Sequence, residues 1–193
     1  MARTTDDRIA RIGDAAIEVI AEDGMRGLTH RAVDRAAELP AGSTSYYART
    51  RQALLELAIG RIVELDVAAP ESPAEPADLD ALAGYLAGFL HATITTGKRR
   101  MLARYEFALE ATRRPELREP YDRGGSLLRA RCAELLRTAG SADPERHARL
   151  VIAWLDGLIF DSIAGTGSRR PPDKAELETG IHELLSVLLP TSS

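Results

Sequence analysis

The chain has 193 residues, 45% apolar and 28% charged, which suits a folded protein of one large domain or two small ones and excludes a disordered chain. Its formal net charge of −4 is opposite in sign to the basic surface that DNA phosphates usually meet, so a DNA-binding function needs local positive charge. The single Cys132 excludes an internal disulfide and a cysteine-based metal site.

The amino-terminal segment gives an expectation about the compartment. Its sequence, MARTTDDRIARIG, carries charges where a secretory signal peptide needs an apolar stretch. No run along the chain reaches the roughly 18 uncharged apolar residues that a membrane span requires. We therefore expect a cytoplasmic protein with no membrane partner.

Apolar residues recur at helical spacing along almost the whole chain, and no useful length alternates as a half-buried strand does. The first helix is expected to follow a cap at Thr4 or Thr5 and to stop at Gly24. Thr29 can cap a second helix that spans His30 to Glu38.

After that helix the chain breaks and resumes. Pro40 suits the first turn of a third helix, because the N–H that proline lacks would have no partner there. Thr50 can cap a fourth helix, and the three prolines in 68–77 indicate a loop. Further helices are expected at about 79–93, 98–113, 116–138 (kinked at 123–125), 144–164 and 174–189.

The fold class is therefore all-α, with about nine helices. Short helices at the front precede a larger helical body, which favours a compact module joined to a bundle. We expect an N-terminal three-helix module at residues 1–52, followed by a larger helical domain at residues 53–193.

The expected third helix has the residue types that a DNA recognition helix needs. Such a helix enters the major groove with small or hydrogen-bonding residues and grips phosphates with larger groups behind them. The stretch 41–45, AGSTS, meets the first requirement. Tyr46, Tyr47 and Arg51 meet the second.

Local charge also favours DNA binding, because residues 24–55 carry a formal charge of +3 although the whole chain is acidic. One alternative remains open at this point. The same segment could be a surface helical hairpin, with Tyr46 and Tyr47 packed in the core and the arginines solvated.

Three motifs, EDGMRGLTHRAV, AGSTSYY and TRQALL, align without a gap with the DNA-binding domain of the TetR family of transcriptional regulators. Residues of about 5–55 resemble that domain. The resemblance implies a helix-turn-helix DNA-binding domain at residues 1–52 and a helical effector-binding and dimerisation domain at residues 53–193. The later segment WLDGLIFD is similar to the penultimate, dimer-forming helix of many members. The resemblance implies phosphate contacts near Thr29 and His30, a base contact from Arg31, groove-facing positions for Ala41, Gly42 and Ser43, and backbone contacts from Tyr46, Tyr47 and Arg51.

Three positions depart from the family pattern. Glu38 stands where the turn usually has glycine, so we expect a strained or shifted backbone there. Pro40 replaces a Ser or Thr cap, and Ala48 replaces an aromatic residue, which leaves a smaller contact between the third and fourth helices. Glu38 and the acidic total charge support one alternative function, a helical small-molecule-binding adaptor that no longer binds DNA.

Most of the later aromatic residues lie on helices that, by the resemblance, surround an effector cavity. Small-molecule sites are mainly apolar pockets with a few placed polar groups. The alternative is that these residues fill the core, and that Glu110 pairs with Arg113 or Arg114 along its own helix. The candidate pocket residues are Tyr85, Phe89, Met101, Arg104, Tyr105, Glu110, Tyr121 and Trp154.

Dimerisation is expected because one short recognition helix reads only a few base pairs, so specificity calls for two half-sites and a twofold protein. Two late apolar stripes could form a four-helix interface between two copies. For half of each stripe, burial within one chain remains the alternative. The candidate interface residues are Val151, Leu155, Leu158, Ile159, Ile181, Leu184, Leu185 and Leu188.

No catalytic set is recognisable after about residue 60, and the histidines there are scattered, so we expect no enzyme, cofactor or metal site. The sequence favours a ligand-responsive transcriptional regulator. It would act as a repressor that binds a palindromic double-stranded DNA operator as a homodimer, and an unknown small-molecule effector would release it.

Overall fold

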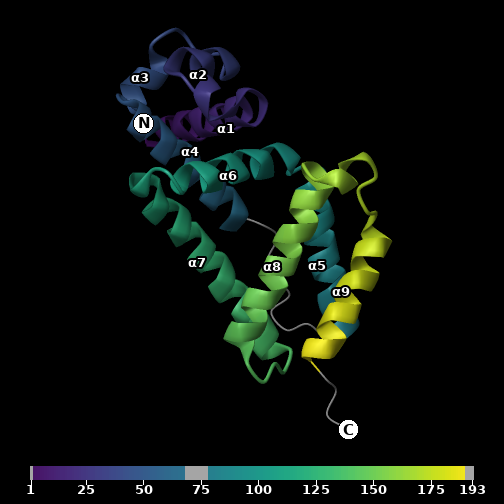
Figure 1. The fold of residues 1–193 in the computed structure, drawn as a ribbon. Coiled ribbons are helices and arrows are strands. Elements are labelled where there is room, and N and C mark those ends of the chain that lie inside the picture. The colour runs from purple at the N-terminus through teal and green to yellow at the C-terminus, as the bar shows by residue number, and fades with distance from the viewer. Residues whose placement is uncertain (1, 68–77, 190–193) are drawn as a thin grey trace. The chain divides into compact units, whose positions relative to one another are not determined.

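The computed structural model describes residues 2–67 and 78–189 of the chain (Figure 1). The described residues form helices and no strand, which confirms the all-α prediction. None of these helices is both long and apolar enough to cross a bilayer. The helices are α1 (Ala2–Gly27), α2 (His30–Ala36), α3 (Ser43–Tyr47), α4 (Arg51–Val67), α5 (Leu79–Ile94), α6 (Lys98–Ala111), α7 (Pro115–Thr138), α8 (Pro144–Ile163), η1 (Thr166–Arg169) and α9 (Lys174–Leu188).

The chain divides into two compact units. The first comprises Met1–Val67 and Arg99–Gly124, which hold α1 to α4, α6 and the first half of α7. The second comprises Ala68–Lys98 and Gly125–Ser193, which hold α5, the rest of α7, α8 and α9. The assignment of residues 1–52 to DNA binding and 53–193 to effector binding and dimerisation stays a prediction.

The core of the first unit joins its N-terminal helices to α6. α1 packs against both α2 and α4. Phe107 of α6 is 1% exposed and belongs to the same buried cluster as residues of α1, α2 and α4. The largest fully buried side chains of this cluster are Ile12, Ile20, Leu28, Leu54, Leu55, Ile62, Phe107 and Leu117.

The observed ends of α1 and α2 agree in part with those predicted from the sequence. α1 begins at Ala2, ahead of the predicted caps Thr4 and Thr5, which corrects that prediction. Gly24 leaves the helical region with φ 69° and ψ −177°, as expected of a residue without a Cβ atom at a helix end. The Thr29 hydroxyl oxygen accepts a hydrogen bond from the Ala32 N–H at 3.1 Å and caps α2 as predicted.

The third helix does not begin at Pro40, so that prediction is wrong. α3 begins at Ser43, because the Pro40 carbonyl first accepts a turn bond from the Ser43 N–H at 3.1 Å. Gly42, the residue before the helix, has φ 90° and caps α3 without a side chain. The predicted cap of α4 is confirmed, since the Ala53 N–H donates to the Thr50 hydroxyl oxygen at 3.0 Å.

In the second unit α5 packs along α9 and also contacts α8 (Figure 1). Aspartates set the starts of all three helices: Asp78 caps α5, Asp143 caps α8, and Asp173 forms a capping box with Glu176 at α9. α7 is one continuous helix through the segment where a kink was expected. The loop predicted at 68–77 lies outside the described residues.

Cys132 of α7 gives the first testable prediction. Burial raises the pKa of its thiol from an ordinary value of 9.0 to about 11, because the interior disfavours the thiolate. At about pH 8 the thiol should therefore react with Ellman's reagent about 100-fold more slowly in the native protein than after unfolding in urea. Equal rates in the two states would contradict the burial of this side chain.

Candidate nucleic-acid interface

The connection from α2 to α3 is fixed by the carboxylate of Asp34, which lies on α2 and is 4% exposed. One oxygen, Oδ2, accepts a hydrogen bond from the Gly42 N–H at 2.7 Å. The other, Oδ1, accepts one from the Thr44 N–H, also at 2.7 Å. The start of α3 is thus held from the neighbouring helix rather than by a residue of its own.

The turn before α3 carries the strain that the sequence predicted. Glu38 adopts φ 52°, in the left-handed region that favours glycine, and this costs a non-glycine residue roughly 1 kcal/mol. The backbone is held there because the Glu38 N–H donates to the Arg35 carbonyl and the Leu39 N–H donates to the Asp34 carbonyl. The turn therefore keeps its shape without glycine.

The exposed part of α3 and its approach contains three predicted DNA-binding residues. Ala41 and Gly42 are exposed, and Tyr46 is 76% exposed, so Tyr46 is not the core residue of the hairpin alternative. Ser43 is half-buried, and its hydroxyl donates to the Pro40 carbonyl at 2.6 Å. Thr44, which the sequence pattern grouped with the groove-facing residues, is fully buried, because this position on the short helix faces inward.

Tyr47 and Arg51 have internal roles. Tyr47 is half-buried against the core of the first unit and makes an edge-on ring contact with Tyr46 at a centroid distance of 5.1 Å. The Arg51 guanidinium donates hydrogen bonds to the carbonyls of Met25 and Leu28, where α1 gives way to α2. Arg51 thus fastens the start of α4 to the end of α1.

At the start of α2, some of the predicted DNA-binding residues make internal hydrogen bonds and others are exposed. His30 Nε2 lies 2.6 Å from the Ala48 carbonyl oxygen, which can only accept, so Nε2 carries the proton and links α2 to the end of α3. Thr29 is exposed and caps the helix. Arg31 is exposed and makes no ion pair within the described residues.

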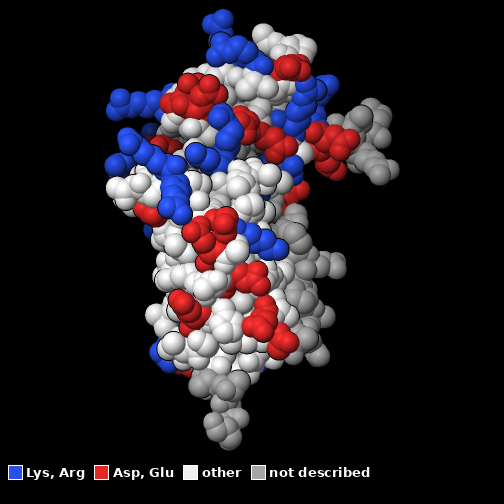
Figure 2. Space-filling model, turned by 90° about the vertical axis from the view of Figure 1, so that its right-hand side faces the viewer, with Lys and Arg blue, Asp and Glu red and all other residues white. Residues whose placement is uncertain are grey.

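Sequence reasoning did not select two arginines that the structure exposes beside these residues. Arg35 of α2 and Arg49, just before α4, are exposed and, like Arg31, form no ion pair in the part of the chain that is described. The local charge of the segment was the signal that could have identified them. On the face shown in Figure 2, Lys and Arg side chains gather mainly over the N-terminal helices, with Asp and Glu among them.

The ionisation of Asp34 gives a second prediction. Burial opposes its charge, but hydrogen bonds from Thr44 and Gly42, helped by nearby His30, outweigh it and hold the pKa of Asp34 below its ordinary value of 3.8. Its contribution to stability is therefore complete above about pH 4 and is lost as the pH falls through the lower folded-state pKa. The difference in unfolding free energy between wild type and D34N should shrink below about pH 4 in urea titrations. A difference that stays constant down to acid pH would contradict this.

Three arginines of α6 connect that helix to α1 and α4. Arg99 pairs with Glu18 and, at 3.1 Å, with Glu22 of α1. Both remaining arginines meet Asp66 of α4: Arg100 at 3.0 Å and Arg104 at 3.4 Å. The pairs with Asp66 are partly buried, since the side chains of Arg104 and Asp66 are 14% and 19% exposed. α6 is therefore fastened by charge as well as by Phe107 to the helices that carry the candidate interface.

A family model described as tetracyclin repressor-like, C-terminal domain, matches residues 77–188, which is more than half of the chain. The chain belongs to the TetR family of transcriptional regulators. The helix-turn-helix geometry described above lies outside the matched range and adds an independent likeness to this family. No curated protein sequence matched the chain.

Solved structures of TetR-family proteins support the assignment. The multidrug binding protein EbrR complexed with ethidium is 32% identical, with a TM-score of 0.66 over 95% of this chain and 99% of that one. A TetR-family member from Streptomyces coelicolor A3 is 30% identical, with a TM-score of 0.67 over 90% and 95% of the two chains. A TetR-family regulator from Rhodococcus sp. has a TM-score of 0.77 over 95% and 99%, and at 19% identity it shows the fold alone.

In this TetR-family chain the predicted effector residues fall in both units. Tyr85, Phe89 and Trp154 are half-buried in the second unit, where Trp154 lies 3.5 Å from the position that a Cβ atom on Gly180 of α9 would occupy. Met101, Arg104, Tyr105, Glu110 and Tyr121 belong to the first unit.

Several residues of the first-unit group have structural roles. Met101 is 2% exposed, and Tyr121 packs against the core of the first unit. Glu110 pairs with Arg114 at 2.7 Å and with Arg113 at 3.6 Å, as the alternative interpretation of that residue expected. For these three residues the packing and ion pairs favour a structural role over effector contact.

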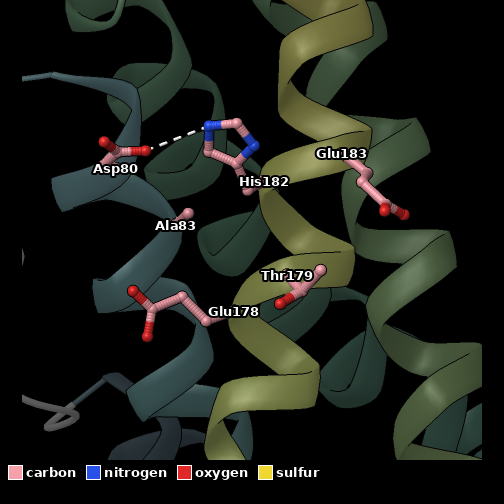
Figure 3. Close-up of a pocket in the computed structure, with 6 residues that line it drawn as sticks. All are labelled: Asp80, Ala83, Glu178, Thr179, His182 and Glu183. Carbon is pink, nitrogen blue, oxygen red and sulfur yellow. Dashed lines mark ion pairs between the residues drawn. The ribbon is translucent and has the colours of Figure 1, made fainter.

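One surface pocket, of about 420 Å³, lies between α5 and α9 and includes none of the eight predicted effector residues (Figure 3). Asp80 and Ala83 come from α5, and Glu178, Thr179, His182 and Glu183 come from α9. His182 Nε2 and the Asp80 carboxylate point toward one another at 3.1 Å. Most of the lining residues carry polar groups and the pocket is open, unlike the enclosed apolar sites typical of drug-sized ligands.

The predicted dimer residues stay a prediction, and most of them are buried within the single chain. Five of the eight are at most 9% exposed in a single chain, so they pack within their own unit: Val151, Leu155, Ile159, Ile181 and Leu185. Leu158, Leu184 and Leu188 are half-buried. The periodic stripes thus serve mainly as the internal face of α8 and α9, and any partner must meet the neighbouring face of these helices.

Proposed function

We propose that this TetR-family chain is a transcriptional repressor that binds a palindromic operator as a homodimer and is released by a small-molecule effector. One observation carries the proposal: Gly42 and Tyr46, at either end of α3, are exposed, and the exposed arginines Arg31, Arg35 and Arg49 of the same segment have no ion-pair partner among the described residues. Arginines without carboxylate partners are available to phosphates and base edges. We place this activity in the cytoplasm.

The exposed groups of this segment suit major-groove recognition. Ala41 and Gly42 add little bulk, so the backbone could approach base edges closely. Tyr46 could reach a phosphate with its hydroxyl, since most of its side chain is exposed. Thr29 at the start of α2 would lie along the adjoining DNA backbone, and Arg31 could reach a base edge.

A homodimer is supported by large apolar side chains that remain exposed on α8 and α9. Leu150 is 46% exposed, Phe160 is 50% exposed and Val187 is 78% exposed. Ala153 and Gly157 are exposed on α8 between the first two, so a second helix could approach that face closely. F160E combined with V187E should convert the dimer to a monomer in sedimentation equilibrium. A dimer that survives this double substitution would place the interface elsewhere.

An effector of aromatic character is supported by the relative EbrR, whose structures include complexes with proflavin and with ethidium. Tyr85, Phe89 and Trp154, all half-buried in the second unit, are side chains that could stack against such rings. The arginines of α6 provide a route for release, because any displacement of α6 would pull on α1 and α4. A coupling free energy of about 1 to 3 kcal/mol would be ordinary for such a regulator.

Catalysis by a serine and a histidine does not form part of the proposal, although the turn before α8 brings such a pair together. Ser141 Oγ and His147 Nδ1 are 2.8 Å apart. Arg146 donates to His147 Nε2 at 2.9 Å, and arginine has no acceptor, so the ring proton must sit on Nδ1 and point at the serine. This imidazole therefore cannot accept the serine proton, which nucleophilic activation would require.

The test uses the full-length chain and double-stranded DNA from the region upstream of its own gene. Fluorescence anisotropy with this DNA and with a scrambled duplex of equal length should show a sequence-specific complex whose affinity falls steeply as salt is raised. Binding to both duplexes alike at low salt would instead favour the small-molecule adaptor that no longer reads DNA.

A further inference from the structure

We propose that Asp34 is a positioning residue for operator recognition, whose carboxylate sets where the leading residues of α3 lie relative to α2 and thus which base edges they reach. This inference rests on the proposed DNA-binding function. The sequence analysis did not identify Asp34 as a candidate DNA-binding residue. Its side chain is only 4% exposed, so we expect it to act on the interface without contacting DNA.

α3 needs an external support because it is very short. It has five residues, and a single helical turn is only marginally stable without tertiary contacts. Its N-cap, Gly42, has no side chain to receive the free N–H groups of the first turn. The carboxylate of Asp34 receives two of the N–H groups at this end, those of Gly42 and Thr44, at 2.7 Å each.

These two bonds lie on either side of Ser43, so the carboxylate fixes the backbone on both sides of a residue predicted to face the groove. The support also comes from α2, whose N-cap is Thr29. Thr29, which is expected at a phosphate, and the leading residues of α3, which are expected at bases, are therefore both positioned by α2. Because misplacement by about 1 Å lengthens base hydrogen bonds beyond their useful range, this reference would control specificity more than total affinity.

A carboxylate suits this position and an amide does not. Two N–H donors converge on one side chain, and only a carboxylate presents two acceptor oxygens. An asparagine of the same shape would accept one bond and turn its own NH₂ group toward the other N–H. The charge also strengthens both bonds, since hydrogen bonds to an ionised group are stronger than neutral ones.

The experiment compares D34N with D14N in the full-length protein. Asp14 is the matched control, because it pairs with Arg61 at 2.7 Å between α1 and α4 and makes no recorded hydrogen bond to α3. Wild-type protein first selects its preferred duplex from a random-sequence library. Affinities are then measured for that duplex and for a scrambled version of it.

D34N should lose at least about 10-fold in affinity for the selected duplex, while its affinity for the scrambled duplex changes by less than about 2-fold. D14N should keep the wild-type ratio of the two affinities, although it removes a carboxylate from the same unit. An unchanged ratio in D34N overturns the inference. If D34N does not fold, D34E takes its place: it keeps both oxygens but displaces them by one methylene, so the ratio must still fall.

A measurement on the unmodified protein separates this inference from the proposed function. The Gly42 amide belongs to an exposed residue, yet its bond to Asp34 should slow its hydrogen exchange about 100-fold relative to an unstructured amide. Rapid exchange of the Gly42 and Thr44 amides overturns the role of Asp34 even if a specific operator is found. Slow exchange with no selected sequence refutes operator binding instead and leaves the carboxylate as a purely structural support.

Discussion

Replacing Arg31 and Arg49 together with alanine is expected to lower operator affinity about 100-fold at about 150 mM salt. Both arginines are exposed and have no ion-pair partner in the described structure, so their removal breaks no internal ion pair. A dimer would lose four positive charges. If all four meet phosphates, the slope of log affinity against log salt should become shallower by about three to four.

The matched control for this variant is R169A with R170A. These arginines lie at and just after η1 in the second unit, both are exposed, and the Arg170 side chain is 92% exposed. The net charge changes by the same amount, so any effect of total charge on DNA binding appears in both variants. Equal losses of affinity in the two would show that the surface beside α3 has no special part in binding.

Replacing Phe107 with alanine is expected to lower the free energy of unfolding by about 3 to 5 kcal/mol. The ring is 1% exposed in the core that α6 shares with α1, α2 and α4, so its removal leaves a cavity as well as losing apolar burial. Urea denaturation followed by circular dichroism measures the change. The loss should accompany weaker operator binding, because the same core supports the helix-turn-helix.

Leu109 provides the control on the same helix. It is 58% exposed, so L109A should change the free energy of unfolding by no more than about 0.5 kcal/mol. A small effect of F107A, similar to that of L109A, would show that α6 does not belong to the core of the first unit.

The sequence predicted the helix caps, helix ends and turns that depend on single residues and their immediate neighbours. Thr29 and Thr50 cap helices as their positions predicted, because a hydroxyl followed by a helical pattern specifies a helix start. Gly24 ends the regular part of α1, and Glu38 takes the left-handed conformation that its place in the turn demanded. These features need no knowledge of the tertiary structure.

The features that the sequence did not predict depend on contacts between residues far apart in the chain. Asp34 looks like an ordinary charged residue of an amphipathic helix, since nothing in its neighbours indicates two N–H groups eight and ten positions later. The stripes on α8 and α9 have the same period whether they face a partner or their own core, so periodicity could not show that Val151 and Ile181 are buried within the single chain. Arg51 likewise fits a phosphate contact by sequence, although it binds backbone carbonyls of α1 and the α1–α2 connection.

The division of the chain has a practical consequence for anyone who recombines regulators of this kind. The first unit is discontinuous in sequence: it consists of Met1–Val67 and Arg99–Gly124, and the segment between them, which contains α5, belongs to the second unit. No single cut can therefore detach the first unit with its interior intact, since truncation after α4 would remove Phe107 and leave a cavity. A working chimera needs three junctions, one on each side of α5 and one within α7 after Gly124, so that the donor's α6 travels with its own α3.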